Sequence, residues 1–166
     1  MHRAKEFGLK ATGVDYDLDA VVKRSRGVAG QLSGGIGHLM KKNKINVIMG
    51  TGKLVKGPKV QVTDAEGKVT EYTAKNIIVA TGGRAKELPN LPIDGEKIIE
   101  YRKAMSLPKM PKRMVVVGAG AIGVEFGYFY HTMGTEVSIV EFMEQGLVPR
   151  EDADISKELA KLYKRK

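Results

Sequence analysis

The stretch that decides the fold is MVVVGAGAIGVEFGYFYHTMGTEVSIVE, residues 114–141. It begins with four apolar residues, continues into glycines at fixed offsets, and ends on an acid after a second apolar run. We expect residues 114–117 to form a buried strand, residues 118–123 to open a helix that runs to about Met133, and residues 137–140 to form a second strand. The stretch therefore predicts a βαβ unit with a glycine-rich corner between its first strand and its helix.

Each glycine of this corner has a mechanical reason to be there. Gly118 allows the tight turn, Gly120 lets the main chain approach a pyrophosphate, and Gly123 lets the helix pack against the strand. Unpaired amides and the positive end of the helix dipole then attract the diphosphate. The residues predicted to bind a cofactor at this corner are Gly118, Ala119, Gly120, Ala121, Ile122 and Gly123.

Glu141 completes the pattern at the end of the second strand, 23 positions beyond Gly118. An acid roughly 20 residues after such a corner meets the adenosine ribose in dinucleotide-binding folds. Its carboxylate accepts hydrogen bonds from the ribose hydroxyls and repels a 2′-phosphate, so the pattern favours NAD over NADP. The alternative is that the glycines make only a structural turn.

The spacing of apolar residues in the sequence before this unit changes twice. Residues 17–42 place apolar side chains at three- and four-residue steps, which predicts a helix with Asp17 as its cap, and its five glycines suggest close approach of another backbone or a ligand. Residues 46–73 alternate with a period of two and predict short strands of an antiparallel meander, with breaks at 57–58 and 64–67. The continuous apolar run 77–80 predicts a strand covered on both faces.

Composition excludes several classes of function. The net charge is +9, but the basic residues are spread thinly except at residues 41–44 and 161–166, and no aromatic residue interleaves with the first cluster, so we expect no nucleic-acid partner and interpret Lys41 and Lys42 as a solvated helix end. The chain has no cysteine, and His38 and His131 lack partners at ligand spacing, so we expect no metal site and no catalytic side chain. Without a long apolar run or a signal-like amino terminus, we expect a cytoplasmic protein away from membranes.

Several linked motifs carry a resemblance to a known family. The segments LSGGIGHLMKKNKINVIMGTGKLV, YTAKNIIVATGG and VVVGAGAIGVEFGYFYHTMGTEVSIVE, in this order, resemble the flavoprotein disulfide reductases of the class I pyridine nucleotide-disulfide oxidoreductase family, most closely the dihydrolipoyl dehydrogenases. The resemblance implies an α/β fold with two incomplete Rossmann-like nucleotide-binding domains. Residues 1–112 would belong to the FAD-binding domain, including the meander, and residues 113–166 to the NAD-binding domain.

The resemblance also implies roles for residues outside the glycine corner. It places Thr81, Gly82 and Gly83 beside the flavin nucleotide and Gly52 near the adenine side of FAD. It brings Glu125 toward the nicotinamide and the flavin, where its family counterpart pairs with a lysine that this chain lacks. Spacing alone would let Glu125 simply favour the helix dipole.

For the full-length parent, the resemblance implies oxidation of dihydrolipoamide by NAD⁺ through FAD and a redox disulfide. It implies a homodimer that serves a lipoyl-bearing acyltransferase of 2-oxo acid dehydrogenase complexes or a glycine cleavage protein. The family's FAD glycine fingerprint, redox cysteine pair and His-Glu pair do not appear in this sequence. We therefore expect an internal fragment without lipoamide turnover of its own. Two alternatives stay open: another NAD-linked flavoprotein reductase, and a non-enzymatic nucleotide-binding module.

Overall fold

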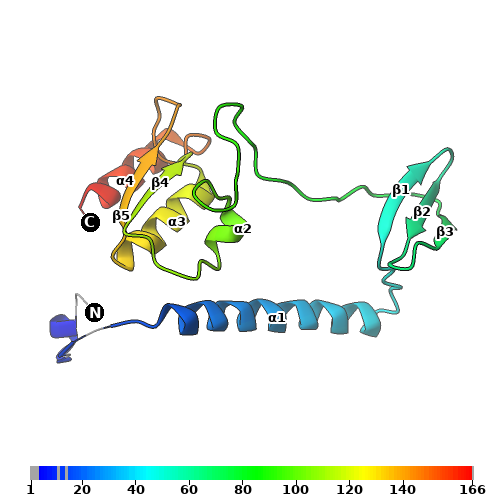
Figure 1. Ribbon diagram of the computed structural model, residues 1–166, viewed down its shortest axis with the longest axis horizontal. Coiled ribbons are helices and arrows are strands. Elements are labelled where there is room, and N and C mark those ends of the chain that lie inside the picture. The colour runs from blue at the N-terminus through cyan, green and yellow to red at the C-terminus, as the bar shows by residue number, and fades with distance from the viewer. Residues whose placement is uncertain (1–3, 11, 14, 166) are drawn as a thin grey trace. The chain divides into compact units, whose positions relative to one another are not determined.

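The computed structural model describes residues 4–10, 12–13 and 15–165 of the 166-residue chain. Contacts divide the chain into two compact units, residues 26–84 and residues 1–25 with 85–166, and each is described by itself. The elements, labelled in Figure 1, are η1 (Ala4–Phe7), α1 (Leu18–Lys42), β1 (Thr51–Val55), β2 (Lys59–Thr63), β3 (Val69–Thr73), α2 (Tyr101–Ala104), β4 (Arg113–Val117), α3 (Ala121–Thr132), β5 (Glu136–Val140) and α4 (Ala153–Lys164). Among the described residues, no helix combines the length and the apolarity needed to cross a bilayer.

Helix α1 has the limits that its sequence predicts. The Asp17 carboxylate accepts a hydrogen bond from the Ala20 N–H at 3.1 Å and so caps the first turn. At the other end, Lys44 takes a positive φ of 55°, and the Asn43 side chain donates to the Leu39 carbonyl at 2.9 Å. Apart from the adjoining residues and the helix's own backbone, no atom of the described chain lies within 4 Å of a Cβ built on any of the helix's five glycines, so the close approach expected there stays a prediction.

The predicted antiparallel meander is confirmed as a three-stranded sheet in the order β1-β2-β3. Its register pairs Gly52 with Val62 and Val60 with Tyr72. The turn between β2 and β3 is held by the Asp64 carboxylate, which accepts from two main-chain amides of the turn. The sheet therefore forms from local pairing alone, because each connection is a short turn.

Two predicted strands of this region are wrong. Residues 46–50 form no strand, and the meander begins only at Thr51. Residues 77–80, expected to be buried on both faces, have no regular structure, and the side chains of Ile78 and Val79 are 90% and 63% exposed. A buried parallel strand needs a neighbouring strand to pair with, and no strand within the described part of the chain lies beside these residues.

The predicted βαβ unit is confirmed. Strands β4 and β5 run parallel, with Met114 opposite Val137 and Val117 opposite Val140, and α3 packs on them. The helix lies close to the sheet because Gly127 faces Ile139, where an added Cβ would lie only 2.8 Å from Ile139 Cδ1. Among the described residues, the buried hydrophobic side chains are those of Ala119, Val124 and Tyr130. The structure thus has the mixed α/β class that the sequence predicts.

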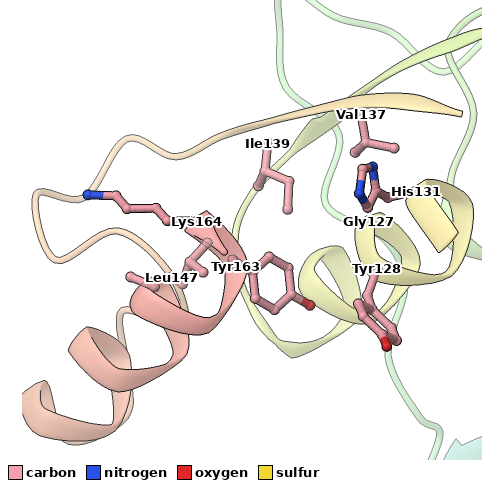
Figure 2. Close-up of a pocket in the computed structure, with 9 residues that line it drawn as sticks. Gly127, Tyr128, His131, Val137, Ile139, Leu147, Tyr163 and Lys164 are labelled. Carbon is pink, nitrogen blue, oxygen red and sulfur yellow. The ribbon is translucent and has the colours of Figure 1, made fainter. Parts of the chain in front are cut away.

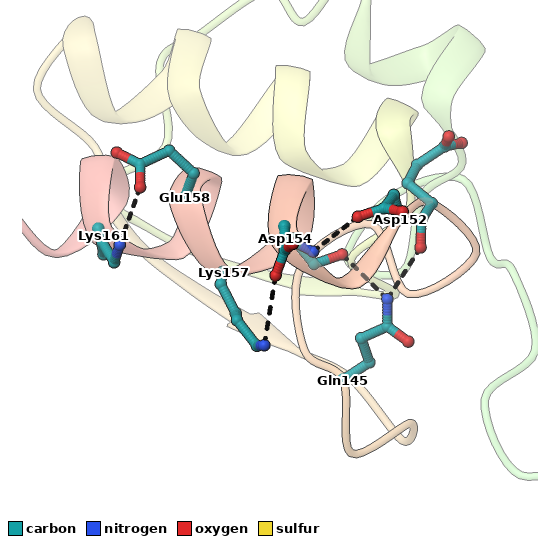
Figure 3. Close-up of polar contacts among 8 residues, drawn as sticks. Gln145, Asp152, Asp154, Lys157, Glu158 and Lys161 are labelled. Carbon is teal, nitrogen blue, oxygen red and sulfur yellow. Dashed lines mark hydrogen bonds and ion pairs between the residues drawn. The ribbon is translucent and has the colours of Figure 1, made fainter.

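Helix α4 and the loop before it were not predicted from the sequence. Asp152 caps α4 by accepting from the Asp154 N–H at 2.9 Å, and the Gln145 side chain donates to the Glu151 carbonyl and to Ser156 Oγ (Figure 3). Exposed ion pairs Lys157–Asp154 and Lys161–Glu158 lie along the helix and contribute little to stability. The buried Ser156 hydroxyl donates to the Val148 carbonyl, which fixes the loop after β5 to α4.

A buried hydroxyl links α3 to the short helix α2. Tyr130 is 2% exposed, and its hydroxyl donates to the Ala104 carbonyl at 2.6 Å. We expect Tyr130→Phe to lower the free energy of unfolding by about 1 kcal/mol, because the half-buried carbonyl loses its partner. Urea unfolding followed by circular dichroism measures this change. The control is Tyr72→Phe, at a side chain that is 40% exposed; an equal effect of both changes would contradict the assignment.

Candidate dinucleotide-binding site

The glycine corner turns directly from β4 into α3. Gly118 has a φ of +101°, which only glycine adopts without strain, and its N–H donates to the Val140 carbonyl at 2.8 Å. This bond extends the β4–β5 pairing by one position past Val117. The corner therefore lies at the carboxyl ends of both parallel strands, which is where open α/β sheets bind their ligands.

The other two glycines of the corner serve different purposes. A Cβ on Gly123 would collide with the Gly118 carbonyl oxygen and would lie 3.2 Å from Val116 Cγ1, so only glycine fits where the helix crosses the strand. Gly120 is exposed and has φ −68° and ψ 176°, which any residue adopts, and no atom lies within 4 Å of a Cβ built on it. The packing thus requires Gly123, whereas the open space at Gly120 leaves room for a ligand.

The start of α3 presents main-chain amides. Its first intrahelical hydrogen bond runs from the Val124 N–H to the Gly120 carbonyl at 3.0 Å. The N–H groups of Ala121, Ile122 and Gly123 precede that bond and have no partner within the helix. Ala121 and Ile122 are exposed. These amides can donate to a diphosphate, and the helix dipole adds to the attraction.

Glu141 turns back to the glycine corner. Its Oε2 accepts from the Ala119 N–H at 2.8 Å, and its Oε1 accepts from the Met143 N–H at 2.9 Å. These bonds, from Met143 first and then from Ala119, hold the pKa of the Glu141 carboxyl below its ordinary value of 4.5. The group is therefore ionised at neutral pH. A carboxylate has about four lone-pair sites, so it can still accept hydrogen bonds from a ligand.

The loop after β5 closes over Ala119, which is fully buried. The Val148 N–H donates to the Ala119 carbonyl at 2.7 Å, while the Val148 carbonyl accepts from the Glu151 N–H and from Ser156 Oγ. Val148 has a φ of +43°, which is strained for a β-branched residue. Sequence reasoning missed this support for the corner, because a valine gives no signal of a left-handed backbone.

Glu125 lies in the second turn of α3, and its side chain is exposed. The Tyr163 hydroxyl of α4 donates to the carbonyl of the preceding residue, Val124, at 2.9 Å. Burial raises the pKa of Tyr163, and the neighbouring Tyr128 and Glu125 raise it further. The structure therefore brings Glu125 near α4, and its approach to a nicotinamide and a flavin stays a prediction.

The residues predicted to contact FAD lie in the unit of residues 26–84. Gly52 is in β1, where an added Cβ would make only ordinary contact with Val60, whereas the neighbouring Gly50 would bring its Cβ to 2.5 Å from the Thr63 carbonyl oxygen. Thr81 is exposed and Gly82 has a φ of +77°. Gly82 and Gly83 both have open space around them. The structure does not pair this segment with β1, and the flavin roles stay predictions.

An apolar pocket of about 380 Å³ lies between α3, β5 and α4 (Figure 2). Its lining includes Tyr128, His131, Val137, Ile139, Tyr163 and Lys164. None of the residues predicted to bind a cofactor lines it. Among the described residues, no group of histidine, aspartate or glutamate side chains is arranged to hold a metal.

A parallel βαβ unit with a glycine corner and an acid at the end of its second strand defines the class of Rossmann-type dinucleotide-binding proteins. The chain belongs to the pyridine nucleotide-disulphide oxidoreductase family, because the sequence model of that family matches residues 3–166. This is a family of flavoprotein oxidoreductases linked to NAD(P). The resemblance noted in the sequence is therefore confirmed.

The relatives of this chain point to one branch of the family. It is 45% identical over 166 residues to a dihydrolipoyl dehydrogenase of Zymomonas mobilis, covering 100% of this chain and 35% of the relative. It is 44% identical over 159 residues to the dihydrolipoyl dehydrogenase of Chlorobaculum tepidum, covering 96% and 34%. The solved structure of LpdA from Mycobacterium tuberculosis matches with a TM-score of 0.86 and 29% identity, covering 99% of this chain and 36% of that one. The chain thus spans about a third of the length of these relatives.

Proposed function

We propose that this chain binds NAD at the glycine corner and supplies part of the FAD-binding surface of a dihydrolipoyl dehydrogenase. The observation that carries the proposal is the hydrogen bond from the Ala119 N–H to the Glu141 carboxylate at 2.8 Å. It joins the predicted ribose acid to the predicted diphosphate loop, although the two are 22 positions apart. The identity of 45% to a dihydrolipoyl dehydrogenase over the whole chain supports the choice of enzyme.

In this proposal the corner contacts the diphosphate of the dinucleotide, and the acid after β5 contacts its ribose. The amides of Ala121 and Ile122 donate to the diphosphate, and Gly120 leaves room for it. Glu141 accepts from the ribose hydroxyls and excludes a 2′-phosphate by charge repulsion, because its low pKa keeps it ionised. NAD thereby binds in preference to NADP.

The FAD-contacting residues of the proposal are Gly52, Thr81, Gly82 and Gly83. Gly82 supports this role because its positive φ and open surroundings expose main-chain amides without a side chain in the way. When bound, FAD and NAD supply the electron-transfer chemistry, and the polypeptide positions them. Glu125 is proposed to face the nicotinamide from the second turn of α3.

For the whole protein we propose oxidation of dihydrolipoamide with reduction of NAD⁺, as the names of the relatives suggest. The proposed partners are a second copy of the chain and the lipoyl-bearing acyltransferase of a 2-oxo acid dehydrogenase complex or a glycine cleavage protein. We place the protein in the cytoplasm.

Calorimetric titration of the 166-residue chain tests nucleotide binding. We expect NADH to bind at millimolar or lower concentration and NADPH to bind at least about tenfold more weakly, since the ionised carboxylate repels the extra phosphate. We also expect no dihydrolipoamide-dependent NADH formation by this chain, because its sequence contains no cysteine. Absence of heat with millimolar NADH, or turnover well above buffer, would refute these expectations.

A second candidate function is another NAD-linked flavoprotein reductase. It is favoured by the match to the flavoprotein disulfide reductase RclA of Escherichia coli, with a TM-score of 0.75 and 25% identity. The two candidates differ in the direction of electron flow. Dihydrolipoamide is a dithiol that donates electrons to NAD⁺, whereas a disulfide or a quinone accepts electrons from NADH. Assays of the full-length protein for NAD⁺ reduction by dihydrolipoamide and for NADH oxidation by disulfides or quinones distinguish the two candidates.

A further inference from the structure

Ala119 is held by hydrogen bonds on both sides of its Cα atom. Its N–H donates to Glu141 Oε2 at 2.8 Å, and its carbonyl accepts from the Val148 N–H at 2.7 Å. Its side chain is fully buried, so the residue cannot rotate without breaking one of these bonds or leaving the core. The conformation of the glycine corner therefore depends on the loop after β5 as well as on the acid.

The bond from Val148 also sets the direction of the Gly120 N–H. The Ala119 carbonyl and the Gly120 N–H belong to one trans peptide group, in which the two groups point in opposite directions. The Gly120 N–H therefore points away from Val148. Gly120 is exposed at the N-cap of α3, and its N–H makes no hydrogen bond within the described part of the chain. It can therefore donate to a ligand in the open space around Gly120.

Ser156 supports the turn at Val148 from inside the protein. Its side chain is 1% exposed, and its Oγ donates to the Val148 carbonyl at 3.1 Å. The same Oγ accepts from Gln145 Nε2 at 3.2 Å, which orients the hydroxyl (Figure 3). Because Val148 has the strained φ of +43°, the turn needs such bonds to keep its conformation.

We propose that Ser156 is a positioning residue for the diphosphate of the bound dinucleotide. Its hydroxyl fixes the turn at Val148, the turn fixes the Ala119 carbonyl, and the planar peptide then aims the Gly120 N–H at a phosphate oxygen. This inference rests on the proposed NAD binding. Since Ser156 acts on the diphosphate and Glu141 on the ribose, loss of the Ser156 hydroxyl weakens every ligand with this diphosphate by the same factor. The preference for NADH over NADPH stays unchanged.

Thr135 provides a matched control for a purely structural role. It is 2% exposed, and its Oγ1 donates to the Pro111 carbonyl at 2.7 Å. Thr135 directly precedes β5 and Pro111 lies just before β4, so this bond lies at the amino ends of the two strands, away from the glycine corner. Thr135 and Ser156 thus share burial and the kind of partner, and differ in the end of the sheet that they support.

The test measures dissociation constants by calorimetry for NADH, NADPH and ADP-ribose, which all contain the diphosphate. The proteins are the 166-residue chain, Ser156→Ala and Thr135→Val, well below their unfolding temperatures. We expect Ser156→Ala to weaken all three ligands by about 3- to 10-fold, the factor for one hydrogen bond between neutral groups. Thr135→Val should lose stability and bind like the parent.

Two further measurements support the comparison. In a proton–nitrogen correlation spectrum of the ligand-free chain, the Gly120 amide resonance should move in Ser156→Ala and stay in place in Thr135→Val. Gln145→Ala removes a donor to Ser156 Oγ at an exposed position. It should weaken the same ligands by a smaller factor, and it decides the question if Ser156→Ala does not fold.

Each outcome assigns the failure to one proposal. If the parent binds NADH and Glu141→Ala weakens it, but Ser156→Ala binds like the parent or no more weakly than Thr135→Val, the positioning role is overturned and the proposed function stands. If Ser156→Ala weakens NADH but not ADP-ribose, the residue acts on the nicotinamide end, which also overturns the inference. If the parent binds none of the three ligands, both proposals are rejected.

Discussion

Replacement of Gly123 by alanine is expected to destabilise the βαβ unit by about 1–3 kcal/mol or more, the typical range of overpacking. The added methyl group would collide with the carbonyl oxygen of Gly118 and crowd Val116 Cγ1. A main-chain oxygen cannot rotate away as a flexible side chain can, so α3 must shift off β4. Urea unfolding followed by circular dichroism measures the loss, and NADH binding should disappear with it because the helix amides move.

Gly120→Ala is the matched control for this substitution. Gly120 has an ordinary backbone conformation and open surroundings, so the stability should change by less than about 0.5 kcal/mol. NADH affinity should nevertheless fall by about tenfold or more, because the methyl group occupies the space proposed for the diphosphate. Comparison of Gly123→Ala with Gly120→Ala therefore distinguishes a loss of packing from a loss of nucleotide binding. Equal destabilisation by both variants would contradict the assigned roles, and so would full NADH affinity in Gly120→Ala.

Replacement of Glu141 by alanine is expected to weaken NADH binding by about 10- to 100-fold, since a hydrogen bond to a charged group is stronger than one to a neutral group. The affinity for NADPH should fall by a smaller factor, because the variant also removes the repulsion of the 2′-phosphate. The two affinities should therefore converge. Calorimetric titration of both nucleotides measures the ratio. Glu136→Ala, at an exposed acid at the start of β5, is the control and should preserve the preference for NADH.

The pH dependence of stability gives an independent measurement of the same carboxylate. Amide hydrogen bonds hold its pKa below 4.5 in the folded chain, so the stabilisation is present above the unfolded value and is lost as the pH falls through the folded value. The difference in melting temperature between the parent and Glu141→Gln should therefore be largest near neutral pH and shrink below about pH 4. A difference that stayed constant from pH 7 to pH 3 would show that the charge makes no contribution.

The sequence by itself determined the elements whose partners lie nearby along the chain. The helix at 18–42, the antiparallel meander and the βαβ unit follow from periodicity, turn residues and the glycine corner. The distance from Gly118 to Glu141 was also sufficient to predict that the acid faces the corner, and its bond to Ala119 agrees. In these cases one turn or one crossover brings the interacting groups together.

Only the tertiary structure decided which strands pair and which surfaces are covered. The apolar run 77–80 reads as a buried strand, yet it stays exposed because hydrophobicity does not supply a neighbouring strand. The closure of Val148 over Ala119, with a φ of +43°, depends on hydrogen bonds from three separate segments. The local sequence pattern determines the preferred backbone conformation, whereas the burial of a side chain depends on which residues from distant parts of the sequence pack against it.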